Sequence, residues 1–325
     1  MRWGTLGRLG RVSRLTLGGG GIGQIWGTTS HDEALATLRA GIDAGIDLLD
    51  TAPMYRNCEA FVGEAFGGKL PPGLRVTSKC ALGSPPPAEA PARIVTTLEA
   101  SLAAMKLERI DLYFLHTNLC ADDFVYAHGQ QHRDQWATKW SIYADAVVPT
   151  FERLLRDGRI GAWGITGVGV PETILEALDQ APRPHAVQVI ANLLDSPGGL
   201  RRYAEPARPR EIARAAAQAG IGVMGIRAVQ AGALTSELDR TMSPNYPDAR
   251  DYERAAPFRD LCKRWGDDPA RVAHRYALSL PDFGTIVLGV KNQAELAQCL
   301  EAEAAGPLDA AQLREIDALG LRARP

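Results

Sequence analysis

Short apolar runs alternate with longer amphipathic segments along nearly the whole chain. Eight runs have the length of strands, and we predict strands at residues 15–17, 46–49, 74–77, 112–115, 161–165, 186–190, 221–225 and 285–288. Between them, apolar residues recur three or four positions apart, which predicts helices that include residues 35–42, 94–105, 147–154 and 272–276. We also expect a hairpin around residues 8–14, before the first strand.

Glycines mark the ends of several predicted helices. Gly45, Gly158 and Gly220 each stand just before a predicted strand, where a helix ends by turning left-handed. Strands and helices that alternate with such short returns predict a parallel sheet. Eight units favour closure into a (β/α)8 barrel of the α/β class, since an open doubly wound sheet more often has five to seven strands. We expect residues 1–325 to form one such domain.

Two connections are much longer than the others, and both follow a predicted strand. They run from about 117 to 143, after the fourth strand, and from about 228 to 251, after the seventh. In a barrel of this kind the chemistry lies on loops after strands. We expect these two loops and the C-terminal tail to form pocket walls. Aromatic residues in the first loop either line the pocket as a lid or only anchor the loop to the barrel: Tyr126, Trp136, Trp140 and Tyr143.

Composition narrows the possible partners. The chain is 46% hydrophobic and 23% charged, as in ordinary globular proteins, and its formal net charge is −2. This charge gives no electrostatic case for nucleic acid or an anionic membrane, so a small molecule is the expected partner. Five scattered cysteines without a C-x-x-C pair indicate reduced thiols rather than disulfides or a metal site. Without a signal sequence or membrane span, a cytoplasmic location is expected; the sequence sets no oligomeric state.

Four polar residues lie at or just past the carboxyl ends of three predicted strands. They are Asp50, Tyr55, Lys79 and His116. The carboxyl ends of parallel strands share one rim, so these groups are expected to meet in one pocket. A lysine near a tyrosine lowers the phenol's pKa from its usual value of about 10. With Asp50 holding the lysine and His116 donating to a substrate oxygen, the group is suited to protonating a carbonyl or deprotonating an alcohol.

Each of these residues also has an ordinary structural explanation when taken alone. Asp50 is a possible turn former, Lys79 a solvated rim residue and His116 a core histidine; the functional reading depends on their occurring together. Carbonyl reduction also needs a hydride, which no side chain supplies, so a nicotinamide cofactor is inferred. The glycine-rich residues 18–23 are weak evidence for a Rossmann site, but they permit close approach of the backbone to a flat ligand.

The residues around this tetrad resemble the aldo-keto reductase superfamily. The resemblance lies in residues 45–55 followed by Glu59 and Gly63, in residues 77–79 and in residues 111–116, and it extends over nearly the whole chain. It implies that Tyr55 is the general acid and base, assisted by Asp50, Lys79 and His116.

The resemblance also implies a cofactor site. Gln188 would hold the nicotinamide carboxamide, and residues 232–235 the pyrophosphate. Residues 288–292, followed by residues 295–296, would hold the adenosine end. Lys291 would pair with a 2′-phosphate, which favours NADPH and leaves NADH possible. The complete set of expected cofactor-binding residues is Gly20, Thr166, Gln188, Ile226, Arg227, Leu234, Lys291, Asn292, Glu295 and Gln298.

Three positions depart from the family pattern. Thr166-Gly167 stands where Ser-Asn is common, and Ile226 or Arg227 must cover the nicotinamide face that a tyrosine often covers. Gln298 and Cys299 replace the glutamate and asparagine that often clamp the adenine. These changes bear on cofactor affinity more than on proton transfer.

The main functional hypothesis is an NADPH-dependent reductase of aldehydes or ketones, reversible as an alcohol or sugar dehydrogenase. Two alternatives stay open on the sequence alone. One is a Schiff-base lyase with Lys79 as nucleophile, although a nearby Asp50 would keep that lysine charged. The other is a nicotinamide-binding regulatory subunit with little turnover.

Overall fold

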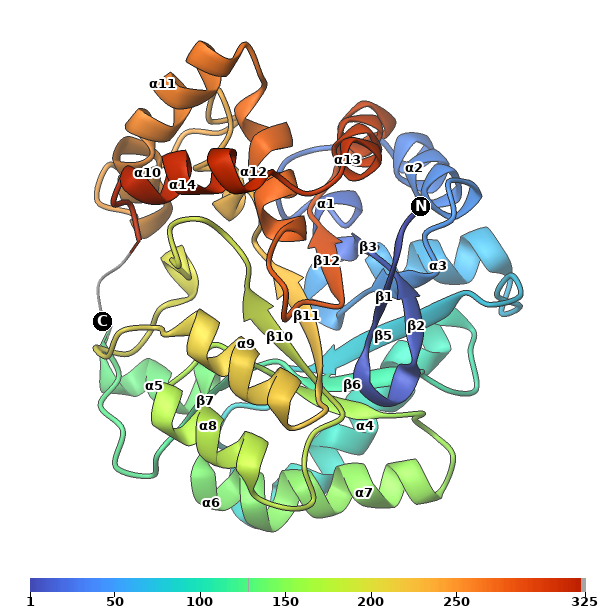
Figure 1. Cartoon of the computed structure of the whole chain (residues 1–325). Helices are drawn as coiled ribbons and strands as arrows, with labels where there is room; N and C mark the ends of the chain where they lie inside the picture. Colours follow the sequence, from blue (N-terminus) through green and yellow to red (C-terminus); the bar gives the residue numbers. More distant parts are fainter. Residues whose placement is uncertain (128, 323–325) are drawn as a thin grey trace.

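Eight parallel strands close into a barrel in the computed structural model, which describes residues 1–127 and 129–322 (Figure 1). Around the barrel the strand order is β10-β11-β12-β3-β4-β5-β6-β9. The strands are β3 (Leu15–Gly18), β4 (Leu48–Asp50), β5 (Arg75–Cys80), β6 (Leu112–Leu115), β9 (Trp163–Thr166), β10 (Ala186–Ile190), β11 (Gly222–Ile226) and β12 (Thr285–Leu288). The (β/α)8 barrel predicted from the sequence is confirmed, and every predicted strand overlaps an observed one.

Helices cover the outside of the barrel (Figure 1). They are α1 (Gly19–Ile22), α2 (His31–Asp43), α3 (Cys58–Phe66), α4 (Ala90–Met105), α5 (Arg133–Trp136), α6 (Trp140–Ile142), α7 (Val148–Arg156), α8 (Pro171–Asp179), α9 (Pro209–Gln218), α10 (Pro247–Arg254), α11 (Ala256–Trp265), α12 (Pro269–Leu278), α13 (Gln293–Ala305) and α14 (Ala310–Ala318). The apolar faces of α2, α3, α4, α7, α8 and α9 pack on the strands in the largest hydrophobic cluster, whereas α11 and α14 pack with α12 in a second cluster.

An N-terminal hairpin closes the end of the barrel where the strands begin. It pairs β1 (Trp3–Thr5) with β2 (Arg11–Ser13) in antiparallel fashion, so it starts earlier than the predicted 8–14. Leu6 and Val12 of the hairpin are fully buried in a cluster with Leu48, Phe114 and Met224 from the barrel strands. The barrel is therefore open only toward the carboxyl ends of its strands.

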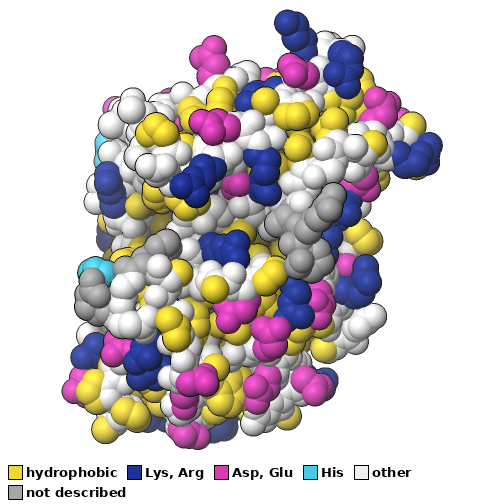
Figure 2. Space-filling model, turned by 90° about the vertical axis from the view of Figure 1, so that its left-hand side faces the viewer, with side chains coloured by type: hydrophobic (Ala, Val, Ile, Leu, Met, Phe, Trp, Pro, Cys, Tyr) yellow, Lys and Arg dark blue, Asp and Glu magenta, His cyan; other side chains and the backbone are white. Residues whose placement is uncertain are grey.

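Both long connections contain regular structure. Residues 117–143 include a short parallel pair, β7 (Asn118–Cys120) with β8 (Ala137–Lys139), and residues 228–251 lead into α10. No helix in the described part of the chain is long and apolar enough to cross a membrane. On the face drawn in Figure 2, Lys and Arg side chains are interspersed with Asp and Glu, so no extended patch of one charge forms there.

Candidate active site

A cavity of about 570 Å³ opens at the carboxyl ends of the barrel strands. Asp50 at the end of β4, Tyr55 in the turn after it and His116 directly after β6 all line this cavity. Lys79 lies behind them within β5, fully buried, because this strand extends to Cys80 instead of ending at the predicted residue 77. The four residues expected to converge are thus brought together on one rim.

Lys79 is the centre of the contacts among these residues. Its ammonium donates to Asp50 Oδ2 at 2.7 Å, to the Thr51 carbonyl at 2.9 Å and to the Tyr55 hydroxyl at 3.2 Å. All three protons of the ammonium therefore have an acceptor. The Asp50 carboxylate is fixed in turn, since its Oδ1 accepts from Thr77 at 2.8 Å and from Gln188 at 2.6 Å.

The surroundings keep Lys79 charged. Burial alone would lower the pKa of this ammonium, but Asp50 and Tyr55 outweigh burial and raise the pKa above its usual value. A neutral amine, which nucleophilic attack requires, is therefore disfavoured at physiological pH.

The phenol of Tyr55 does not become unusually acidic. Burial raises its pKa above 10, and the nearby Asp50 carboxylate adds to the increase; Lys79 opposes both without cancelling them. The expectation of a lowered pKa is wrong for this structure, because the loss of water around the phenolate costs more than one ammonium at 3.2 Å returns. Tyr55 is consequently a protonated donor over the physiological pH range.

His116 stands edge-on to Tyr55, with ring centroids 5.7 Å apart. Burial, and then the Lys79 charge, lower its pKa to about 3, so the imidazole is neutral at physiological pH. Its Nδ1 is buried without a hydrogen-bond partner among the described residues. A neutral ring beside a phenol can donate one hydrogen bond to an oxygen that also accepts from Tyr55.

The glycine-rich segment packs against backbone rather than forming a Rossmann turn. A Cβ on Gly18 would lie 2.0 Å from the Leu288 carbonyl oxygen, and one on Gly21 would lie 1.9 Å from that of Val290. A Cβ on Gly23 would lie 2.1 Å from the carbonyl oxygen of Tyr55 itself. These glycines let the segment lie directly against the end of β12 and against the turn that holds Tyr55.

The structure brings most of the expected cofactor-binding residues to the cavity. Those that line it are Gly20, Thr166, Gln188, Ile226, Arg227, Lys291, Glu295 and Gln298. Leu234 and Asn292 do not line it. Leu234 is buried in the cluster formed with α11 and α12, and the Asn292 side chain caps α13 by accepting from the Glu295 backbone.

Several of these side chains already have partners within the protein. The Lys291 ammonium pairs with Asp239 and, at 2.9 Å, with Glu295. Arg227 is held by Asp248 at 2.5 Å and by Gln230 at 2.9 Å, which anchors the connection after β11. Of the two residues expected to cover the nicotinamide face, Arg227 is thus held by other contacts, and Ile226 is the one left to provide an apolar surface.

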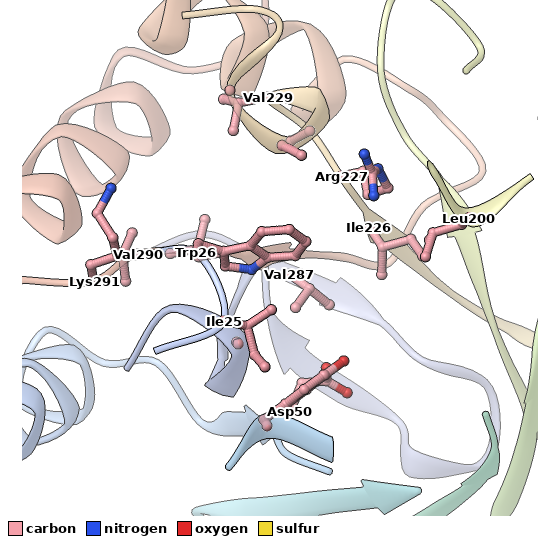
Figure 3. Close-up of a pocket in the computed structure, with 18 of the residues that line it drawn as sticks. Ile25, Trp26, Asp50, Leu200, Ile226, Arg227, Val229, Val287, Val290 and Lys291 are labelled. Carbon is pink, nitrogen blue, oxygen red and sulfur yellow. The ribbon is translucent and has the colours of Figure 1, made fainter. Parts of the chain in front are cut away.

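Sequence reasoning missed several residues of the cavity. Trp26 projects across it above Ile25 and Val287, with Asp50 further below (Figure 3). His274 lies at the end near α13, with its Nε2 3.5 Å from the thiol of Cys299, the residue already expected near the adenine. Trp26 could have been predicted to line the cavity, because it is a large aromatic residue just after the glycine-rich segment. His274 could not, because in the sequence it is one of many residues of an amphipathic helix.

Only part of the predicted lid forms a cavity wall. Trp136 lines the cavity, while Tyr126 and Tyr143 are buried in neighbouring hydrophobic clusters and Trp140 packs against the core. Leu200 and Arg202, from the connection after β10, provide a wall that was not expected. The C-terminal tail, as far as residue 322, contributes none of the lining.

Comparisons with known proteins agree with this architecture. A family model described as the Aldo/keto reductase family matches residues 14–320. The chain therefore belongs to the aldo/keto reductase family and is an NAD(P)-dependent oxidoreductase with a TIM barrel.

Individual relatives are distant. L-galactose dehydrogenase of Arabidopsis thaliana is 23% identical, over 95% of this chain and 91% of the relative. Methylglyoxal reductase YeaE of Escherichia coli is 29% identical over 41% of this chain and 39% of the relative. Among solved structures, the holo form of the aldo-keto reductase AKR11C1 from Bacillus halodurans shares the fold, with a TM-score of 0.69 and 21% identity over 98% of this chain and 96% of that one.

Proposed function

We propose that this protein catalyses NADPH-dependent reduction of an aldehyde or ketone to an alcohol, and the reverse oxidation. The observation that carries the proposal is the Lys79 ammonium, which bridges Asp50 at 2.7 Å and the Tyr55 hydroxyl at 3.2 Å beside the cavity. Such an arrangement positions one phenolic proton and a charge that stabilises its departure.

Each residue of the tetrad has a distinct task in this proposal. Tyr55 gives its proton to the substrate oxygen, and Lys79 stabilises the phenolate that remains. Asp50 holds Lys79 in place, and neutral His116 donates a hydrogen bond that orients the carbonyl. A nicotinamide cofactor, when held in this cavity, would supply the hydride.

The cavity has features that suit a dinucleotide. It extends from the tetrad to Lys291, Glu295 and Gln298 at the start of α13, and the backbone of Gly18, Gly20 and Gly289 lines it. Lys291 supports NADPH over NADH because an ammonium can pair with a 2′-phosphate. Its two carboxylate partners, Asp239 and Glu295, would have to share it with the phosphate, which limits that preference.

We place the reaction in a reducing compartment such as the cytoplasm. All five cysteines, Cys58, Cys80, Cys120, Cys262 and Cys299, are buried and unpaired. Free thiols in this number are typical of intracellular proteins.

A Schiff-base lyase is the weaker candidate. Its nucleophile would be Lys79, whose ammonium is held charged by Asp50 and directs its three protons to protein acceptors. Trapping of a substrate adduct on Lys79 with borohydride would reverse this ranking.

The decisive experiment is fluorescence titration with NADPH and NADH, followed by turnover of a panel of aldehydes and sugars by the wild type and Tyr55→Phe. We expect the variant to bind NADPH like the wild type and to lose nearly all turnover. Full activity of Tyr55→Phe would refute the assigned role. Cofactor binding by the wild type without turnover of any aldehyde or sugar would favour a regulatory subunit.

A further inference from the structure

Five cationic side chains line the cavity, and one of them stands apart. Arg227 pairs with Asp248, Arg240 with Asp239, Arg271 with Asp267, and Lys291 with Asp239 and Glu295. Arg202 has no carboxylate partner among the described residues. Glu205, three positions further along the chain, forms no ion pair with it either.

The contacts of Arg202 fix its position while leaving most of its donors free. Its guanidinium lies over the Trp136 ring at 4.3 Å from the centroid, and it donates to the Tyr126 hydroxyl at 3.4 Å. Its backbone carbonyl accepts from Ala127 at 3.0 Å, which joins the connections after β6 and β10. A guanidinium has five N–H donors, and stacking on a ring leaves its edge available for a planar anion.

Arg202 belongs to a segment whose labelled member, Leu200, lies away from the end of the cavity assigned to the cofactor's adenosine. Leu200, two residues earlier, is on the opposite side of the cavity from Lys291, with Trp26 between them (Figure 3). Three lining residues come from the connection after β6: Thr117 and Asn118, which directly follow His116, and Trp136, on which Arg202 stacks. An anion bound by Arg202 would therefore belong to the molecule that meets His116 and Tyr55, which is the substrate.

We propose that Arg202 makes this enzyme selective for carbonyl substrates that carry a carboxylate or phosphate. This inference rests on the proposed function, because it names the class of substrate that would bind in the same cavity as the cofactor. The shared chemistry is a planar or tetrahedral anion held by a guanidinium through charge-assisted hydrogen bonds. Apolar walls from Leu200, Ile226 and Trp136 would pack on the carbon skeleton between the anion and the carbonyl.

The test compares matched substrates that differ only in charge. Para-carboxybenzaldehyde is measured beside its methyl ester, and glyceraldehyde 3-phosphate beside glyceraldehyde, with the wild type, Arg202→Met, Arg202→Lys and the control Arg201→Met. Arg201 is exposed and donates to the backbone of Tyr203 and Ala204, so it is a neighbouring arginine outside the cavity lining. The two substrate pairs separate a carboxylate preference from a phosphate preference.

We expect Arg202→Met to lower kcat/KM for at least one anionic substrate by about 10-fold to 100-fold, mainly through KM. The neutral partner should be nearly unaffected, Arg202→Lys should retain part of the preference, and Arg201→Met should resemble the wild type. A merely structural role in joining the two loops would lower turnover of charged and neutral substrates equally. That result, or a wild type without any preference for the anionic partner, would overturn the inference.

A binding measurement separates failure of this inference from failure of the proposed function. Para-(hydroxymethyl)benzoate is titrated into the protein with NADP⁺ present, and tryptophan fluorescence is followed, since Trp136 is in contact with Arg202. Binding by the wild type and its loss in Arg202→Met would support the anion site even if no aldehyde were reduced. Equal binding by both proteins, or by neither, would refute it.

Discussion

At the scale of single residues, the site depends on a buried ion pair. Lys79 is fully buried and Asp50 is 2% exposed, so both charges have lost nearly all of their hydration. We expect Lys79→Met to lower the free energy of unfolding by about 3 to 5 kcal/mol, because Asp50 is left charged and unpaired. Urea denaturation measures this loss. The double variant Asp50→Asn/Lys79→Met should recover part of it, and equal stability of the single and double variants would contradict the explanation.

The raised pKa of Tyr55 predicts opposite pH profiles for the two directions. In the proposed mechanism reduction needs the protonated phenol, so kcat/KM should stay level through neutral pH and fall only above the raised pKa. Oxidation needs the phenolate, so its kcat/KM should rise with pH over the same range. His116 has a pKa of about 3, so its titration should not change kcat/KM in either direction near neutral pH. A reduction profile that falls near pH 7 would show that another group titrates.

At the scale of elements, the glycine-rich segment positions the turn that carries Tyr55. Gly23 has a φ of −79°, so alanine is conformationally allowed there, and what opposes it is contact with the Tyr55 carbonyl at 2.1 Å and, less severely, with the Gly19 carbonyl oxygen at 2.7 Å. We expect Gly23→Ala to displace this turn and to lower kcat at least tenfold, since small misplacements of a catalytic group are costly. Gly41→Ala in α2 is the control, because its Cβ would meet only flexible side chains. Unchanged kcat in Gly23→Ala would show that the glycine-rich segment does not position the turn that carries Tyr55.

The elements were largely predictable, and the contacts between loops were not. Strands such as residues 112–115 and 186–190 were predicted with their observed bounds, because buried parallel strands are nearly continuous apolar runs. Asp50, Tyr55, Lys79 and His116 could be placed on one rim for the same reason. Arg202 could not, since its contact with Trp136 joins the connections after β6 and β10, which are far apart in sequence. The pKa of Tyr55 depends on how much water burial removes, which residue types alone do not determine.

At the scale of the whole molecule, stability and activity belong to opposite ends of the barrel. The hairpin seals one end through Leu6 and Val12, while the cavity opens at the other. We expect Leu6→Ala/Val12→Ala to lower the free energy of unfolding by about 3 to 6 kcal/mol and to leave kcat nearly unchanged in the folded protein. Thermal unfolding and steady-state kinetics measure the two effects. Val125→Ala, at a side chain 72% exposed, is the control; a parallel loss of kcat would contradict this separation.

The burial of every cysteine has a consequence for the durability of the protein. Burial raises the pKa of each thiol, to about 11 for Cys80 and to about 12 for Cys120, Cys262 and Cys299. The thiolate is the form that adds to electrophiles, and here it is both scarce and shielded. Among the described residues, Cys299 is the one thiol that lines the cavity, and its raised pKa keeps it protonated, so a carbonyl substrate of the proposed reaction would meet almost no thiolate there and should inactivate the protein only slowly.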